Sequence, residues 1–114
     1  MRATIWHNPD CGTSRKTLEI LENVVALDLT VIRYLEQPYT RSEIAQLIAA
    51  AGMTPREALR LRGTDAEERG LDTASGSAIL DAMTANPAYV ERPFVWTDRG
   101  ARLCRPQDLV YGLL

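Results

Sequence analysis

The first part of the chain alternates between short apolar runs and a helical apolar stripe. Residues 3–7 favour a strand, and the Asn-Pro-Asp sequence at 8–10 ends it with turn chemistry. A helix is predicted over about 13–25, and a second strand over 29–34. Strand, helix and strand in this order predict a βαβ unit with parallel strands and a right-handed crossover. The apolar positions at helical spacing are Leu18, Leu21 and Val25.

The middle of the chain is dominated by helical patterns separated by glycine and proline. Helices are predicted over about 40–51, 55–62 and 77–85, and the polar segment 63–76 is expected to be a mobile loop. The expected starts and stops are Thr40 with Glu43, Gly52, Thr54 with Pro55 and Glu57, Gly63, and Asn86-Pro87.

Strand patterns return near the end of the chain. Residues 94–97 and 101–104 flank Asp98-Arg99-Gly100, which predicts a hairpin with a three-residue loop. Pro106 then opens a short helix over about 106–111. The element order, βαβ followed by helices and then ββα, predicts an α/β protein.

Length and composition narrow the class of protein. The chain has 114 residues, 46% hydrophobic and 25% charged, so residues 1–114 are expected to form a single globular domain. A membrane span and a secretory leader are not expected, since no apolar run is long enough, and a cytoplasmic protein is the default. A net charge of −2 argues against nucleic acid as a partner. Two cysteines and one histidine are too few for a zinc site built on nitrogen and sulfur ligands, so no metal is expected.

Cys11 is the residue whose surroundings predict chemistry. It directly precedes a predicted helix N-terminus, where free N–H groups and the helix dipole stabilise both a thiolate and an oxyanion. Its neighbours supply a small residue, hydroxyl groups and positive charge: Gly12, Thr13, Ser14 and Arg15. The alternative is a buried cysteine that acts as a small apolar residue, but a turn between polar residues is a poor place for one. His7 either tunes the Cys11 pKa and relays a proton or is simply an edge histidine with satisfied hydrogen bonds.

Two thiol motifs are excluded around Cys11. A Cys-x-x-Cys dithiol would need cysteine where Ser14 stands, and the phosphatase-type loop would need arginine where Thr17 stands. Cys104 could resolve an adduct on Cys11 as an internal disulfide, but an apolar strand residue beside Leu103 is the favoured interpretation.

The run from His7 to Arg15, HNPDCGTSR, closely resembles the signature of glutaredoxin-linked arsenate reductases. Weaker matches follow in the same order along the chain, namely Tyr34-Leu35-Glu36 with Pro38, Gly52-Met53, Ala58-Leu59-Arg60, Glu91-Arg92-Pro93 and Arg102-Leu103-Cys104-Arg105-Pro106. The resemblance implies a thioredoxin-like four-stranded mixed sheet, with the first strand beside the third and a helical insertion at about 36–92. It also implies a cis peptide bond before Pro93.

The resemblance further implies a site in which three arginines hold arsenate beside the nucleophilic Cys11. Carried onto this sequence they are Arg60, Arg92 and Arg105, with Arg62 as an alternative to Arg60. The remaining substrate-binding residues are those that follow the nucleophile, Gly12, Thr13 and Ser14. Arginine forks bind such oxyanions in a bidentate way.

The activity that the resemblance implies is reduction of arsenate to arsenite through a covalent cysteine–arsenate adduct. Glutathione is the implied co-substrate and glutaredoxin the implied partner, with no bound cofactor and a monomeric enzyme. Two other functions stay open: a thioredoxin-like transcriptional regulator that binds RNA polymerase, and a general glutathione-dependent thiol reductase. Ser14 breaks the Cys-x-x-Cys switch that such a regulator often carries.

Overall fold

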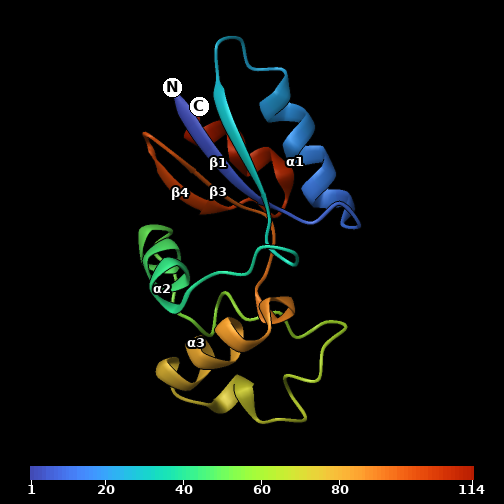
Figure 1. Cartoon of the computed structure of the whole chain (residues 1–114), viewed down its shortest axis with the longest axis vertical. Coiled ribbons are helices and arrows are strands. Elements are labelled where there is room, and N and C mark those ends of the chain that lie inside the picture. Colours follow the sequence, from blue (N-terminus) through green and yellow to red (C-terminus); the bar gives the residue numbers. More distant parts are fainter. The chain divides into compact units, whose positions relative to one another are not determined.

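The computed structural model describes residues 1–114 and contains one four-stranded sheet (Figure 1). The strand order is β2-β1-β3-β4, and β1 pairs with β2 in parallel and with β3 in antiparallel orientation. The elements are β1 (Arg2–His7), α1 (Gly12–Glu22), β2 (Asp28–Arg33), α2 (Arg41–Ala50), the 3₁₀ helix η1 (Leu71–Thr73), α3 (Gly76–Ala85), η2 (Pro87–Tyr89), β3 (Phe94–Thr97), β4 (Gly100–Leu103) and η3 (Gln107–Leu113). The predicted mixed sheet with β1 beside β3 is confirmed.

The chain divides into two compact units. The first contains residues 1–37 and 92–114, and the second contains residues 38–91. The second unit covers nearly the segment in which the helical insertion was predicted, at 36–92. That residues 1–114 act as a single domain stays a prediction.

In the first unit, α1 and η3 pack on the same apolar core as the sheet (Figure 1). Ile5 and Val95 are directly paired across β1 and β3, and both are fully buried. Leu21 of α1 and Val110 of η3 cover them from the helical layer. Burial of each such side chain stabilises the fold by roughly 1.5–3 kcal/mol, so this cluster holds the two helices to the sheet.

In the second unit, α2 has the capping chemistry predicted from its sequence. The Thr40 hydroxyl accepts the Glu43 N–H at 3.1 Å, and the Glu43 carboxylate accepts the Thr40 N–H at 3.1 Å. The helix ends at Ala50, and Gly52 directly follows the C-cap with a φ of 69°, in the left-handed region that favours glycine. Arg41 of α2 then pairs with Asp81 of α3 at 2.7 Å.

The helix predicted over 55–62 is wrong. Thr54 and Glu57 do form reciprocal capping hydrogen bonds, but only one turn follows. Leu59 instead forms an isolated antiparallel bridge with Val90, in which the Arg60 N–H bonds to the Tyr89 oxygen at 2.8 Å. The backbone groups that would continue the helix are therefore used by a distant segment.

Four other segments differ from the predictions in their boundaries or in their secondary structure. α1 ends at Glu22, so Val25 lies beyond the helix and its side chain is 93% exposed. Segment 63–76, expected to be a mobile loop, contains η1 and buries Ala66 and Leu71. The hairpin loop has two residues, because Gly100 already pairs with Thr97. The C-terminal helix is a 3₁₀ helix over Gln107–Leu113.

The cis peptide bond predicted between Arg92 and Pro93 is confirmed. A second cis bond, between Arg105 and Pro106, was not predicted. None of the helices combines the length and the apolar character needed to span a membrane.

Candidate active site

Cys11 lies at the junction between β1 and α1, where a tight turn directs the chain into the helix. The Asn8 side chain accepts the Asp10 N–H at 2.9 Å, and the Cys11 N–H bonds to the Asn8 oxygen at 3.1 Å. The exposed Arg15 side chain stabilises the turn, because its Nη1 atom donates to the Pro9 backbone oxygen at 2.8 Å. Cys11 is thereby placed as the N-cap of α1, with an extended backbone and no side-chain cap. Cys11 therefore lies next to the N–H groups of the first helical turn, which have no hydrogen-bond partner within the helix.

The Cys11 thiol has a lowered pKa, and the groups that lower it are identifiable. Burial raises the pKa, but the backbone N–H of Ser14 and the side chains of Arg92 and Arg105 outweigh burial by binding the thiolate. The result is a pKa of about 7 in place of the usual 9.0. A large fraction of Cys11 is therefore thiolate at neutral pH, and the thiolate is the nucleophilic form.

The two arginines flank the open end of the β3–β4 hairpin, where Phe94 pairs with Leu103. Arg92 stands two residues before β3, and Arg105 stands two residues after β4. The Arg105 Nη1 atom lies 3.5 Å from the Cys11 sulfur and donates to the Arg92 oxygen at 3.1 Å. The Arg92 Nε atom is buried without a hydrogen-bond partner. Two arginine side chains with free N–H donors therefore lie beside the Cys11 thiol, and this arrangement suits an anionic ligand.

His7 contacts Ser14 and is not among the groups that shift the Cys11 pKa. Its Nδ1 atom lies 2.6 Å from the Ser14 hydroxyl oxygen, which also accepts the Asn8 N–H at 3.0 Å. Burial lowers the His7 pKa, and the nearby Arg33 lowers it further. The Ser14 hydroxyl has one donor and two acceptor sites, so it forms this hydrogen bond with either neutral tautomer of the imidazole. His7 therefore fixes the residue whose backbone N–H binds the thiolate.

Gly12 and Thr13 lie at the same end of α1 as Cys11. No contact within the protein requires a glycine at position 12 or a threonine at position 13. A Cβ atom on Gly12 would lie 3.7 Å from the Arg15 Nη2 atom, which is ordinary van der Waals contact. The Thr13 backbone oxygen accepts the Thr17 hydroxyl at 2.8 Å. Any need for a small residue at position 12 would therefore come from a ligand that approaches the backbone.

Comparison with known proteins assigns the family. The ArsC family model matches residues 6–112, nearly the whole chain. The chain belongs to the ArsC family. The arsenate reductase of Rhizobium meliloti is 47% identical over 116 residues, covering 100% of this chain and 82% of that protein. The arsenate reductase of Escherichia coli K12 is 44% identical over 113 residues, covering 97% of this chain and 79% of that protein.

A solved structure agrees with this assignment. The arsenate reductase from Vibrio cholerae superposes with a TM-score of 0.91 at 34% identity, covering 100% of this chain and 98% of that one. The thioredoxin-like mixed sheet with a helical insertion, implied by the sequence resemblance, is confirmed for this member of the ArsC family.

The third arginine of the predicted ArsC site, Arg60, lies in the second unit. Its Nη1 atom pairs with Glu91 at 3.1 Å, and Arg62 pairs with the same carboxylate at 3.4 Å. The Arg60 side chain is 16% exposed and that of Arg62 is 61% exposed. Arg60 is therefore the more firmly held of the two alternatives, and its role toward substrate stays a prediction.

Cys104 occupies the apolar core of this ArsC chain. It is fully buried among Ile5, Leu21 and Val95, and burial raises its pKa to about 12. Both cysteines are free thiols. The predicted strand 101–104 ends at Leu103, so alternation along a strand does not set the direction of Cys104. The interpretation of Cys104 as an apolar packing residue agrees with its position.

Two residues of the ArsC motifs have roles that the sequence did not reveal. Asn8 is buried and holds the turn before Cys11 through both its side chain and its backbone. Glu91 is the shared counter-ion of Arg60 and Arg62. In the sequence, only the position of Asn8 in a turn motif and the position of Glu91 directly before Arg92 could have indicated these roles. No group of three or more His, Cys, Asp or Glu side chains is arranged to hold a metal ion.

Proposed function

We propose that this protein reduces arsenate to arsenite, with Cys11 as the nucleophile. The observation that carries the proposal is the Cys11 thiol, with a pKa of about 7, beside two arginine side chains at a helix N-terminus. Membership of the ArsC family supports the same activity, since the similar proteins from Rhizobium meliloti and Escherichia coli are named arsenate reductases.

The first step forms a bond between Cys11 sulfur and arsenic. The thiolate attacks arsenic(V), an arsenate oxygen takes up protons and leaves as water, and a cysteine–arsenate adduct remains. Arg92 and Arg105 offset the negative charge on the arsenic oxygens through charge-assisted hydrogen bonds. Each such bond is worth roughly 1.5–3 kcal/mol, so the loss of either arginine should weaken oxyanion binding.

The second step transfers two electrons to arsenic. A glutathione thiolate forms a disulfide with the Cys11 sulfur, and the electron pair of the broken sulfur–arsenic bond stays on arsenic, which becomes arsenic(III). Glutaredoxin then attacks the mixed disulfide and releases Cys11 as a thiolate by thiol–disulfide exchange. Cys104 takes no part in this sequence, because its thiol is fully buried and has a raised pKa.

The residues around Cys11 act in this scheme by positioning. His7 holds the Ser14 hydroxyl, and the Ser14 backbone N–H supports the thiolate. Gly12, Thr13 and Ser14 offer first-turn N–H groups to the arsenate oxygens. Arg60 is proposed as the third arginine toward substrate, held by Glu91.

The test is arsenite formation coupled to NADPH consumption, with arsenate, glutathione, glutaredoxin and glutathione reductase present. The wild type should turn over, Cys11→Ser should be inactive, and Cys104→Ser should keep most of its activity. A wild type that reduces glutathione mixed disulfides but never arsenate would contradict the proposal and favour a general thiol reductase.

A further inference from the structure

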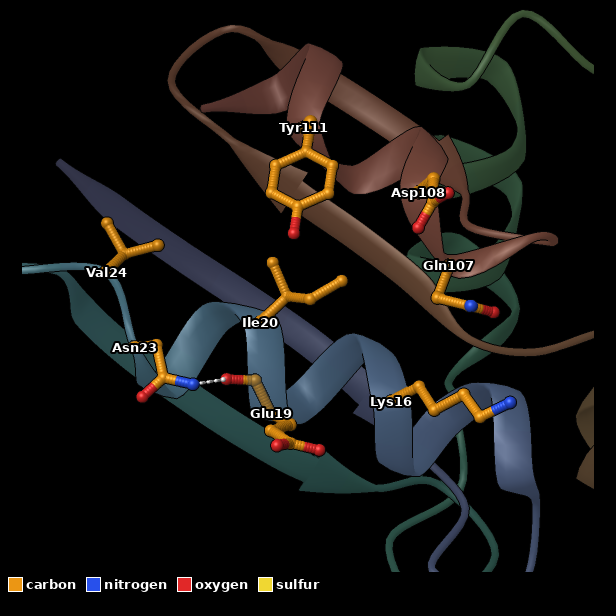
Figure 2. A pocket seen from close by; sticks show the side chains of 8 residues that line it. All are labelled: Lys16, Glu19, Ile20, Asn23, Val24, Gln107, Asp108 and Tyr111. Carbon is orange, nitrogen blue, oxygen red and sulfur yellow. Dashed lines mark hydrogen bonds between the residues drawn. The ribbon is translucent and has the colours of Figure 1, made fainter.

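A groove of about 410 Å³ lies between α1 and η3, on residues of the first unit (Figure 2). We call it the α1–η3 groove. In Figure 2 the Tyr111 ring stands over Ile20, while Lys16 and Gln107 lie at the end toward the start of α1. Its lining residues are Lys16, Glu19, Ile20, Asn23, Val24, Gln107, Asp108 and Tyr111.

The groove carries charges of both signs that are not paired within the protein. Lys16, Glu19 and Asp108 are exposed, and none of them takes part in a salt bridge. Lys16 is also the only lysine of the chain. The apolar part of the groove comes from Ile20, Val24 and Tyr111, and Tyr111 is 59% exposed. An occupant with its own carboxylate, ammonium group and short aliphatic segments would match this lining.

One end of the groove adjoins the segments that carry the candidate active site. Lys16 lies in the second turn of α1, the helix that Cys11 caps. Gln107 begins η3, shortly after Arg105, whose Nη1 atom is 3.5 Å from the Cys11 sulfur. A short peptide in the groove therefore lies along the two helices that begin directly after Cys11 and shortly after Arg105.

We propose that the α1–η3 groove binds the charged ends of glutathione, the reductant in the proposed function on which this inference rests. Lys16 pairs with a glutathione carboxylate, and Asp108, which lies near Gln107 on the η3 side of the groove (Figure 2), faces its ammonium group. The Gln107 amide can both donate to and accept from a peptide group of the tripeptide. The methylene groups of the γ-glutamyl residue pack on Ile20 and Tyr111.

The charge pattern favours glutathione over an uncharged thiol. Glutathione carries one ammonium group and two carboxylates, and the groove offers one cation and two anions. Exposed ion pairs contribute only about 0.2–1 kcal/mol each, so the groove should bind glutathione weakly and discriminate by charge. Weak binding suits a co-substrate that must leave after each turnover.

The kinetic test compares charge reversals inside and outside the groove. Lys16→Glu should raise KM for glutathione about tenfold, since it replaces an attraction by a repulsion. Lys16→Arg should leave KM near the wild-type value, and Arg99→Glu in the exposed β3–β4 turn serves as the matched control. The rate at which uncharged iodoacetamide alkylates Cys11 should be the same in all these proteins, which shows that the thiolate itself is unchanged.

The binding test does not depend on catalysis. S-methylglutathione, which has no free thiol, is titrated into isotopically labelled protein and followed by NMR. The backbone N–H signals of Ile20, Gln107 and Tyr111 should shift in the wild type, and Lys16→Glu should weaken the titration. Shifts confined to other surfaces would overturn the proposal, as would an unchanged KM in Lys16→Glu.

The two tests separate this inference from the proposed function. A wild type that makes no arsenite but shows the S-methylglutathione shifts would refute arsenate reduction and support the groove. Normal arsenite formation with the same glutathione KM in every variant would refute the groove alone. A change in the half-saturating concentration of glutaredoxin, with glutathione unaffected, would assign the groove to a protein reductant and overturn the proposal.

Discussion

The guanidinium of Arg105 lies 3.5 Å from the sulfur of Cys11, although 94 positions separate the two residues along the chain. The same Nη1 atom donates to the backbone oxygen of Arg92 at 3.1 Å. A main-chain oxygen therefore fixes where this cation sits. The charge beside the thiol does not depend on a second flexible side chain, which preserves the site before substrate arrives.

The first prediction concerns the reactivity of Cys11. Its alkylation by iodoacetamide should follow a titration with a midpoint of about 7. Arg105→Ala should move this midpoint upward, because it removes a cation that stabilises the thiolate. Arg2→Ala, a change in an exposed side chain at the start of β1, is the control and should leave the midpoint in place. A wild-type midpoint at or above about 8.5, the value of cysteine in short model peptides, would count against the site as described.

The second prediction concerns the two arginines beside Cys11. Arg92→Ala and Arg105→Ala should each lower arsenate turnover by about 10- to 150-fold, since each loses a charge-assisted hydrogen bond worth roughly 1.5–3 kcal/mol. Arg2→Ala and Arg41→Ala, which change exposed ion pairs, should stay close to wild type. Equal kcat/KM for all four variants would leave the oxyanion site without support.

The third prediction links the Cys11 pKa to stability. The pKa is about 7 in the folded protein and 9.0 ordinarily, so between these values the unfolded chain binds more protons than the folded one. The contribution of Cys11 to the free energy of unfolding should therefore grow as pH rises from about 7 toward 9, and it should vanish below about 7. Urea unfolding of wild type and Cys11→Ser across this range measures it. A stability difference that is independent of pH would contradict the lowered pKa.

The fourth prediction compares two acidic residues of the second unit. Glu91→Gln should lower the free energy of unfolding by about 1–3 kcal/mol, because it leaves the largely buried Arg60 guanidinium with a weaker partner. Asp81→Asn should change it by less than about 1 kcal/mol, since its pair with Arg41 is exposed. Chemical denaturation of both variants tests the contrast, and an equal effect would show that burial of the Arg60 pair does not matter.

The fifth prediction concerns Cys104. Cys104→Ser places a hydroxyl group in an apolar core and should lower the free energy of unfolding by about 1–3 kcal/mol. Below its unfolding temperature, the variant should keep most of its activity with glutathione and glutaredoxin. Mass spectrometry of the wild type after one arsenate turnover without glutathione provides the check. An internal Cys11–Cys104 disulfide as the main product would make the protein a two-thiol reductase.

The sequence predicted correctly those features of the fold that depend on residues close together in the chain. The capping box of Thr40 with Glu43 and the stop at Gly52 are set by residues close in sequence, and both were predicted correctly. The turn at 54–57 shows the limit of such reasoning. Its caps are present, yet the helix stops after one turn because Leu59 pairs with Val90. No local pattern contains that distant partner.

The candidate site shows the same division between local and distant information. The helix N-terminus around Cys11 could be predicted from the sequence, because the turn and the helix are adjacent in the chain. The contact of Arg105 with Cys11 required the family resemblance, since spacing alone says nothing about residues so far apart. The Ser14 hydroxyl links Asn8 to His7, and this role emerged only from the three-dimensional arrangement.

The burial of Cys104 has a consequence for oxidative damage. A low-pKa thiol such as Cys11 reacts with peroxide to give a sulfenic acid, which further peroxide converts irreversibly to the sulfinic and sulfonic acids. Many redox-sensitive proteins avoid this loss by means of a nearby resolving cysteine, but here the second thiol is enclosed in the hydrophobic core. Rescue of the sulfenic acid then depends on thiols from outside the molecule. The survival of the active protein during peroxide stress is thus tied to the size of the surrounding thiol pool.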